Sequence, residues 1–419
     1  MKTKACRLHG KNDLRLDEFE LPELKDDEIL AKIVSDSICM SSYKAAIQGE
    51  DHKRVPADVA ENPVIIGHEF CGEIVEVGSK WQDKFSVGQK LCVQTALNLP
   101  ENPYAAPGYS FRYIGGDATY VIIPAVVMER GCLLNYSGDS YFFGSLGEPM
   151  SCIIGGFHSC YHIKQGTYEH VMGIVPGGNM AILAGAGPMG LGAIDYAIHN
   201  PRRPGRLVVT DIDDARLERA ASILTVEEAR KHGVELHYVN TANLADADAY
   251  LKGLTDGHGY DDVFVFAPVK PVVEQADRLL AYDGCLNFFA GPTNTEFSAM
   301  FNFYNVHYSA THICGSSGGN AQDLIEALDM LSAGVINPAA MITHVGGLNA
   351  VAETTLNLPK IPGGKKLIYT QIDMPLTAID DMEKSEDPVI HELGVIVSRH
   401  NGLWNAEAEK YLLAHSKSI

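Results

Sequence analysis

The chain has 419 residues with a formal net charge of −20, and its 46% hydrophobic and 21% charged residues are the profile of a globular protein. Because so negative a surface repels nucleic acid and anionic membranes, we expect neither as a partner. No apolar run reaches the roughly 18 residues of a membrane span, and the first residues lack the form of a secretory signal. The length exceeds one ordinary core and predicts two domains.

The nine cysteines are scattered along the chain without regular spacing, and their number is odd. That usage is typical of reduced thiols rather than of a disulfide framework. Together with the missing secretory signal, it predicts a cytoplasmic protein.

Short apolar segments bounded by glycine, proline, aspartate or serine dominate residues 1–175, which predicts a β-rich domain. Residues 73–78 alternate polar and apolar side chains, the period of a half-exposed strand. Short strands of this kind are typical of a small barrel or sandwich. The strands expected here are 29–34, 71–77, 90–94 and 118–123.

From residue 176 the pattern changes to strands that alternate with helices, which indicates a parallel sheet with crossover connections. The predicted strands are 179–184, 206–210, 236–239, 262–267 and 285–290, and the predicted helices include 215–224, 270–281 and 320–334. The remaining residues contain short strands, such as 366–370, and a helix at 406–415.

A glycine-rich turn, Gly185-x-Gly187-x-x-Gly190, follows the first of these strands and precedes a helix. The first glycine permits the tight turn, the second lets the backbone approach a pyrophosphate, and the third lets helix and strand pack closely. The amides at the helix N-terminus attract phosphate. This turn, including Pro188 and Met189, predicts a dinucleotide site.

Asp211 lies 21 residues after Gly190, at the end of the next predicted strand. A carboxylate there can accept hydrogen bonds from the adenosine ribose, and it would repel the 2′-phosphate of NADP. The position therefore favours NAD. Arg216, like the arginines at 202, 203 and 206, lies near enough in sequence to keep NADP open.

Cys39, His68 and Glu148 offer a thiolate, an imidazole and a carboxylate, which can hold zinc in a tetrahedron with one open corner. An open corner admits a substrate oxygen. A single residue of these types is more often buried without a ligand role, so composition alone does not establish the site.

The Cys-x-Ser turn at residue 39, the Gly-His-Glu segment at residue 67, the Glu-Pro segment at residue 148 and the later glycine-rich turn resemble, in order and spacing, the zinc-dependent medium-chain dehydrogenases. That resemblance implies an α/β protein. By the resemblance, a GroES-like β-rich catalytic domain would span 1–175 and be completed by 331–419. A Rossmann domain with a doubly wound parallel sheet would span 176–330.

The resemblance also assigns roles. Cys39, His68 and Glu148 would bind one catalytic zinc, Glu69 would be an exchanging ligand or would support one, and Ser41 would relay a proton. Zinc would polarise an alcohol oxygen, and the carbon that bears this oxygen would give a hydride to the nicotinamide.

Two departures from the family pattern stand out. The segment near residues 92–115 has only Cys92 where many relatives carry four cysteines, so no structural zinc is expected. Ser42 stands where the family often has an aspartate, so another group must orient the histidine ligand.

Within the family, a glutamate ligand in place of a second cysteine, together with the missing structural zinc, resembles the polyol dehydrogenase branch. The longer chain, the Cys-Met-Ser-Ser turn and the extra C-terminal residues most resemble its bacterial L-sorbose-1-phosphate reductases. This implies reduction of L-sorbose 1-phosphate to D-glucitol 6-phosphate by a homo-oligomer, a dimer or tetramer paired through the Rossmann sheet edge. Lys44, Arg54 and Arg112 are candidates for the phosphate contact.

Three alternatives remain at this point: a zinc-free quinone reductase, a threonine or other secondary-alcohol dehydrogenase, and a non-catalytic NAD-binding structural or regulatory protein. The polar and aromatic residues of 157–172 could form a second metal site, a lid or oligomer contact, or a solvent-facing loop.

Overall fold

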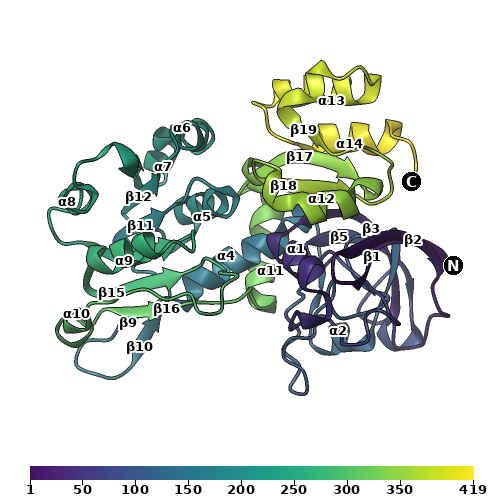
Figure 1. Ribbon diagram of the computed structural model, residues 1–419, viewed down its shortest axis with the longest axis horizontal. Helices are drawn as coiled ribbons and strands as arrows, with labels where there is room; N and C mark the ends of the chain where they lie inside the picture. The colour runs from purple at the N-terminus through teal and green to yellow at the C-terminus, as the bar shows by residue number, and fades with distance from the viewer. The chain divides into compact units, whose positions relative to one another are not determined.

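The computed structural model describes residues 1–419, which fold into two compact units (Figure 1). Unit 1 consists of Met1–Pro149, Asn320–Gly334 and Ile342–Ile419. Unit 2 consists of Met150–Gly319 and Val335–Met341. The chain therefore passes from unit 1 to unit 2 and back twice.

Unit 1 is built mainly from strands. They are β1 (Lys2–Gly10), β2 (Asp13–Glu20), β3 (Ile29–Ile38), β4 (Val64–Ile65), β5 (Phe70–Val77), β6 (Lys90–Val93), β7 (Tyr120–Ile123), β8 (Leu133–Asn135), β17 (Ile342–Gly347), β18 (Lys365–Tyr369) and β19 (Thr377–Ala378). One sheet has the order β2-β1-β4. The other has the order β19-β17-β18-β3-β5-β6-β8, with β7 also paired to β3.

The register around β3 determines which loops meet at its C-terminal end. β3 runs antiparallel to β5, with Asp36 opposite Phe70, and antiparallel to β18, with Ile38 opposite Lys366. The residues just after β3, just before β5 and at the start of β18 therefore lie together. These residues are Cys39, Glu69 and Lys365.

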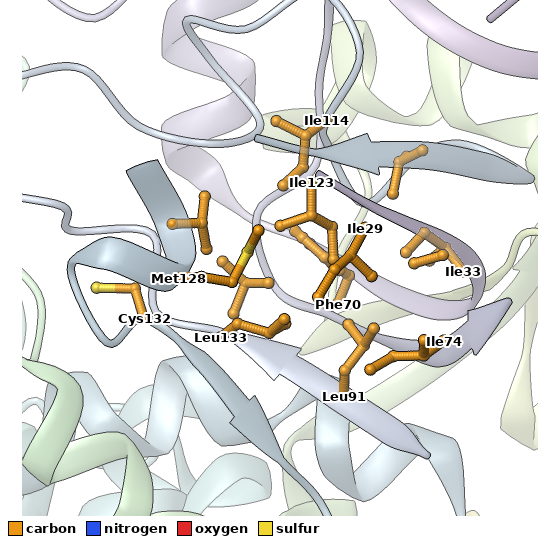
Figure 2. Close-up of a cluster of buried hydrophobic side chains, with 14 of the residues drawn as sticks. Ile29, Ile33, Phe70, Ile74, Leu91, Ile114, Ile123, Met128, Cys132 and Leu133 are labelled. Carbon is orange, nitrogen blue, oxygen red and sulfur yellow. The ribbon is translucent and has the colours of Figure 1, made fainter. Parts of the chain in front are cut away.

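Apolar side chains of β3, β5 and β6 form one core of unit 1 (Figure 2). Ile29 and Ile33 point to the same face of β3, where they meet Phe70 and Ile74 of β5, as the period of two along a strand requires. All four are at most 2% exposed. Burial of each such side chain stabilises the fold by roughly 1.5–3 kcal/mol.

The C-terminal residues are part of unit 1. Trp404 donates a hydrogen bond to the hydroxyl of Tyr369 in β18, and Tyr369 donates to Glu409, each at 2.8 Å. Glu409 also accepts from the backbone amides of Tyr141 and Phe142, at the start of a short helix. The helices of unit 1 are α1 (Met40–Gln48), α2 (Ala125–Glu129), α3 (Tyr141–Ser145), α11 (Ala321–Ser332), α12 (Val351–Asn357), α13 (Pro388–Arg399) and α14 (Ala406–His415).

Unit 2 contains a six-stranded sheet whose neighbouring strands are all parallel (Figure 1). Its strands are β11 (Asn179–Leu183), β12 (Arg206–Asp211), β13 (Glu235–Asn240), β14 (Tyr260–Val265), β15 (Leu280–Phe288) and β16 (His312–Cys314). The order is β13-β12-β11-β14-β15-β16, so the strand order changes direction at β11, the first strand of this sheet in sequence. Doubly wound dinucleotide-binding sheets have the same change of direction. The predicted Rossmann sheet is confirmed.

Helices connect the parallel strands, and a small antiparallel hairpin, β9 (Tyr161–Ile163) with β10 (His170–Met172), precedes them. No helix of the chain combines the length and the apolar character that a membrane crossing needs. The remaining helices are α4 (Gly147–Ser159), α5 (Pro188–His199), α6 (Asp214–Ile223), α7 (Val226–Lys231), α8 (Ala247–Gly253), α9 (Lys270–Leu279) and α10 (Phe303–Tyr308).

The two units do not end where the sequence places the domain boundaries, at residues 175 and 330. Helix α4 lies in the region expected to be β-rich, and its residues Met150 and Ile153 pack against Gly192 of α5, so most of it belongs to unit 2. Helix α11 contributes Leu324 and Leu328, which lie beside Gly147, and belongs to unit 1. Packing partners distant in sequence decide both boundaries.

An ion pair in α5 predicts a pH-dependent contribution to stability. His199 Nδ1 lies 2.8 Å from the carboxylate of Asp195, one turn earlier. The hydrogen bond that His199 donates to the Asp195 carboxylate raises the pKa of His199 against the opposing effect of burial. A raised folded-state pKa adds stability that is complete below the unfolded pKa of about 6.5 and is lost as pH rises through the folded value.

We therefore expect His199→Gln to lower the free energy of unfolding by up to about 1 kcal/mol at acidic pH, and by less at pH values above the raised pKa. Thermal melting of both proteins between about pH 5.5 and 8.5 checks this. A difference in Tm that stays constant across this range would contradict the assignment.

Candidate active site

Three potential metal ligands meet at the C-terminal end of β3. Cys39 caps the N-terminus of α1, and His68 and Glu69 lie in the loop that leads into β5. One ligand atom from each of the three lies within 4.8 Å of the others. Two of the sequence-predicted residues, Cys39 and His68, are thus brought together, with Glu69 beside them.

The ring of His68 is held from both sides by hydroxyl groups. Ser42 Oγ lies 3.3 Å from Nδ1, while Ser41 Oγ and the hydroxyl of Tyr109 each lie 3.2 Å from Nε2. Donation from Nδ1 to Ser42 would leave the Nε2 lone pair for a metal. Ser42 thus stands in the place from which an aspartate orients the histidine in many relatives, and its hydroxyl can do so here.

A buried lysine, Lys365, pairs with Glu69 and stabilises its ionised form. Lys365 Nζ lies 2.5 Å from both carboxylate oxygens, and Ser37 donates a further hydrogen bond to one of them. Burial alone would raise the pKa of Glu69, but the Lys365 charge and these hydrogen bonds lower it. Burial likewise opposes the charge of Lys365, yet Glu69 raises the pKa of this lysine well above its usual value.

Glu148, in the first turn of α4, lies outside the three-residue group but within electrostatic reach of it. Burial raises the pKa of Glu148 to about 7, which His68 partly counteracts and the charges of Glu69 and Cys39 reinforce. The site therefore holds two carboxyl groups that could complete a metal shell. Of these, Glu69 is the one already neutralised by a lysine.

The donor set fits a zinc ion. Burial lowers the pKa of His68, which keeps the imidazole neutral and able to bind metal. Burial and the Glu69 charge raise the pKa of the Cys39 thiol. Lys365 is paired with Glu69. Cys39 and Glu148 would therefore both need a further positive charge nearby in order to ionise. A dication bound by sulfur, nitrogen and oxygen supplies it, and this ligand set is one that zinc accepts.

The glycine-rich turn of unit 2 has the geometry that a pyrophosphate needs. A Cβ on Gly190 would lie 2.0 Å from the carbonyl oxygen of Gly185, so helix α5 and β11 approach each other as only glycine permits. A Cβ on Gly187 would meet nothing within 4 Å, and Gly187 is the N-cap of α5 with Pro188 as the first helical residue. The helix N-terminus therefore opens onto free space.

Asp211 ends β12 and is 7% exposed. One of its oxygens accepts from the amide of Ala186 at 3.2 Å, and the other accepts from the amides of Ile212 and Asp213. The carboxylate thus ties the glycine-rich turn to the end of β12 and retains lone pairs for ribose hydroxyls. Arg216 is exposed and lies 3.8 Å from the Asp213 carboxylate, so its role toward the cofactor stays a prediction.

The sequence missed two residues of this site. Tyr109, 2% exposed, donates a 2.7 Å hydrogen bond to Ser41 and touches His68. Lys365 lies in the segment Pro-Gly-Gly-Lys-Lys at residues 362–366, and no local pattern there shows that it reaches Glu69. Their positions follow from tertiary packing rather than from spacing.

Two family models match the chain. An alcohol dehydrogenase GroES-like domain matches residues 25–130, and a zinc-binding dehydrogenase domain matches residues 188–333. Among solved structures, the 2R,3R-butanediol dehydrogenase of Bacillus subtilis is 22% identical with a TM-score of 0.68, covering 88% of this chain and 99% of that one. At that identity the likeness establishes the fold.

Two curated relatives are much closer in sequence. The mannitol-1-phosphate 5-dehydrogenase of Aliivibrio fischeri is 54% identical over 98% of this chain and 97% of its own length. The L-sorbose 1-phosphate reductase of Klebsiella pneumoniae is 52% identical over 100% of this chain and 98% of its own length. With the fold, the ligand cluster and the glycine-rich turn, they show that the chain belongs to the zinc-dependent medium-chain dehydrogenase/reductase family.

Proposed function

We propose that this enzyme interconverts a phosphorylated ketose and a polyol phosphate with NAD(H), and that L-sorbose 1-phosphate, reduced to D-glucitol 6-phosphate, is its substrate. The zinc would be bound by Cys39, His68 and one carboxylate, either Glu148 or Glu69. One observation carries the phosphate part of the proposal: a cationic side chain, Arg54, lies against the tyrosine that touches His68.

The basic group beside the site consists of Lys44, Lys53 and Arg54 around His52. The charge of these three side chains, together with burial as the largest cause, lowers the pKa of His52 to about 4. The guanidinium of Arg54 lies 5.0 Å from the ring centroid of Tyr109, and His52 stacks on the same ring. In a chain of net charge −20, such a concentration of positive charge favours an anionic substrate group.

The position of this cation favours a phosphate close to the reacting carbon. Tyr109 reaches His68 with its hydroxyl and Arg54 with its ring, so one aromatic side chain spans the distance between ligand and cation. In a ketose 1-phosphate, the phosphate sits on the carbon next to the carbonyl. In mannitol 1-phosphate oxidised at carbon 5, phosphate and reacting carbon are four positions apart. The geometry supports the first arrangement.

The roles of the protein's own groups follow from their contacts. Zinc bound here would supply a Lewis acid for the carbonyl oxygen, and a bound nicotinamide would supply the hydride. Burial raises the pKa of Tyr109 well above its usual value, so Tyr109 stays protonated and donates to Ser41. Ser41, which donates a 3.0 Å hydrogen bond to Cys39 Sγ, would relay a proton towards the substrate oxygen.

NAD is the cofactor that Asp211 favours, because its carboxylate would face the 2′-phosphate of NADP with like charge. We expect Asp211→Ala to weaken NADH binding by about tenfold, the loss of a charged hydrogen bond, and to weaken NADPH binding less. Fluorescence titration of both cofactors measures this. Since Asp211 also holds Ala186, Asp211→Asn serves as a control that keeps a hydrogen-bonding group. Equal losses for both cofactors in Asp211→Ala would remove the ribose role.

We further propose a homo-oligomer that forms through the β16 edge of the parallel sheet. Ile313 of β16 is 44% exposed, and α10, just before it, exposes Phe303, Tyr304 and Tyr308. An edge strand flanked by exposed aromatic side chains is a typical pairing surface. Light scattering of the protein in solution tests this, and a monomer at micromolar concentration would contradict it.

The substrate assignment is tested by steady-state oxidation of NADH with four ketoses: L-sorbose 1-phosphate, fructose 6-phosphate, L-sorbose and fructose. The proposal expects the highest kcat/KM for the 1-phosphate and the lowest values for the free sugars. A higher kcat/KM for fructose 6-phosphate would mean that the phosphate binds away from Arg54. Equal rates for free and phosphorylated sugars would overturn the phosphate assignment and leave the zinc assignment intact.

A further inference from the structure

Three of the nine cysteines converge at one edge of the parallel sheet in unit 2. Cys160 follows the last residue of α4, Cys285 lies in β15 and Cys314 ends β16. The Sγ atoms of Cys285 and Cys314 are 3.5 Å apart, and those of Cys314 and Cys160 are 4.0 Å apart. All three sulfurs lie within 4.8 Å of one another, and Cys160 and Cys285 are fully buried.

The strand register accounts for this convergence. In the parallel pair of β15 and β16, Cys285 lies opposite His312 and Asn287 lies opposite Cys314. Side chains two positions apart share a face of a sheet, so Cys285 and Cys314 point to the same side. The end of α4 lies on that side, because Asn287 donates a 2.8 Å hydrogen bond to the carbonyl of Gly156.

The sulfur spacings match those around a single metal ion. Sulfurs held about 2.3 Å from zinc at tetrahedral angles lie roughly 3.8 Å from one another. The two sulfur separations in the structure, 3.5 and 4.0 Å, lie on either side of that value. They are far longer than the roughly 2.0 Å of a disulfide, so all three sulfurs are available as ligands.

A buried amide lies beside the sulfurs and has one hydrogen that they could share. Asn287 is fully buried, and its Nδ2 lies 3.5 Å from Cys314 Sγ and 3.7 Å from Cys160 Sγ. Thiols are weak acceptors, whereas thiolates bound to a metal accept such N–H groups readily. One of the two Nδ2 hydrogens is donated to the carbonyl of Gly156 at 2.8 Å, and the other is shared among Ser159 Oγ at 3.2 Å and the two sulfurs.

The neighbouring histidines do not form the site. His162 directs Nδ1 at the carbonyl oxygen of Asp283 and Nε2 at the carboxylate of Asp262, at 3.0 and 3.2 Å. Both ring nitrogens of His312 face backbone carbonyl oxygens. Each of the four ring nitrogens thus already faces an oxygen of the protein. Within 157–172, Cys160 belongs to the cysteine cluster, and His162 belongs to a separate group of possible ligands with Asp283 and His312.

We propose that Cys160, Cys285 and Cys314 bind a second zinc ion as thiolates and thereby tie the edge strand β16 to β15 and to the end of α4. The fourth position would face the partly exposed side of Cys314 and take water or another small ligand. This site is distinct from the four-cysteine zinc of relatives, which the segment near residues 92–115 cannot form. It would raise the zinc content above the single ion expected from the sequence.

Metal analysis of the full-length protein, purified under reducing conditions and dialysed against metal-free buffer, tests the proposal. We expect two zinc ions per chain in the unmodified protein and one in Cys285→Ser and in Cys314→Ser, with Cys39 still occupied. Cys132→Ser, at a buried cysteine outside the cluster, is the matched control and should keep two. One zinc in the unmodified protein, unchanged in both cluster variants, would overturn the site.

A second measurement does not depend on the folding of the cluster variants. In Cys39→Ser, the remaining zinc should show an X-ray absorption shell of three sulfurs at about 2.3 Å. Absence of zinc from this variant, or a shell without sulfur, would overturn the proposal. This test of the cysteine cluster is also separate from the test of the proposed reaction, because zinc occupancy at Cys39 and zinc occupancy at the cluster change independently.

Discussion

Cys39→Ser is expected to lose one zinc ion per chain and to lower kcat for ketose phosphate reduction by at least about 10³-fold. Zinc at this position supplies several kcal/mol of charge stabilisation, and each 1.36 kcal/mol corresponds to a factor of ten in rate. NADH binding should persist, because the glycine-rich turn belongs to unit 2 and Cys39 to unit 1.

The controls separate loss of metal from loss of structure. Cys132→Ser, also in unit 1, should retain kcat and zinc content. His68→Ala should reproduce the effect of Cys39→Ser, whereas Glu69→Gln and Glu148→Gln identify the carboxylate that binds the metal. If Cys39→Ser kept its kcat within about tenfold with one zinc ion fewer, the metal would not take part in the chemical step.

Arg54→Met is expected to lower kcat/KM for L-sorbose 1-phosphate by about 10- to 100-fold while changing that for free L-sorbose by less than about threefold. A hydrogen bond between two charged groups contributes about 1.5–3 kcal/mol, which gives the first range. Methionine keeps most of the side-chain volume beside Tyr109, so the ring that touches His68 should stay in place.

Arg112→Met is the matched control for Arg54. Arg112 is an exposed arginine whose guanidinium lies over Tyr113, and the sequence offered it equally as a phosphate contact. The Arg112→Met variant should keep the kcat/KM values for both L-sorbose 1-phosphate and free L-sorbose. Equal losses for the phosphorylated and the free sugar in Arg54→Met would mean that Arg54 holds the site together rather than binding phosphate.

The motifs predictable from sequence are those in which chemistry and backbone are local. The glycine-rich turn needs close contact between Gly185 and Gly190, five residues apart, so its spacing alone carries the structure. The Cys-x-Ser turn is equally local, because Cys39 and Ser41 lie on one turn of α1. Both turns have the local geometry that their spacing predicts, and the roles of their residues stay predictions.

The contacts that complete the site are not local. Lys365 and Glu69 are separated by 296 residues and meet because β18 and β5 lie on either side of β3. Tyr109 reaches Ser41 from a loop with no strand or helix pattern. The sequence identified Ser42 as a departure from the family, but only the coordinates place its hydroxyl at His68 Nδ1.

The same reasoning applies to unit 2. Its strands could be placed from their apolar runs, but helix α4 was missed because the segment begins with the Glu-Pro motif and lies in a β-rich region. The cysteines at 160, 285 and 314 are far apart in sequence and showed no ligand spacing. They meet only once the register of β15 and β16 is known.

Crystals of the protein with L-sorbose 1-phosphate, measured at the zinc absorption edge, test the central claim most directly. The account predicts an anomalous peak within bonding distance of Cys39 Sγ and His68 Nε2, and a phosphate in contact with Arg54. No zinc peak between Cys39 and His68, or a sugar phosphate bound away from Arg54, would contradict it.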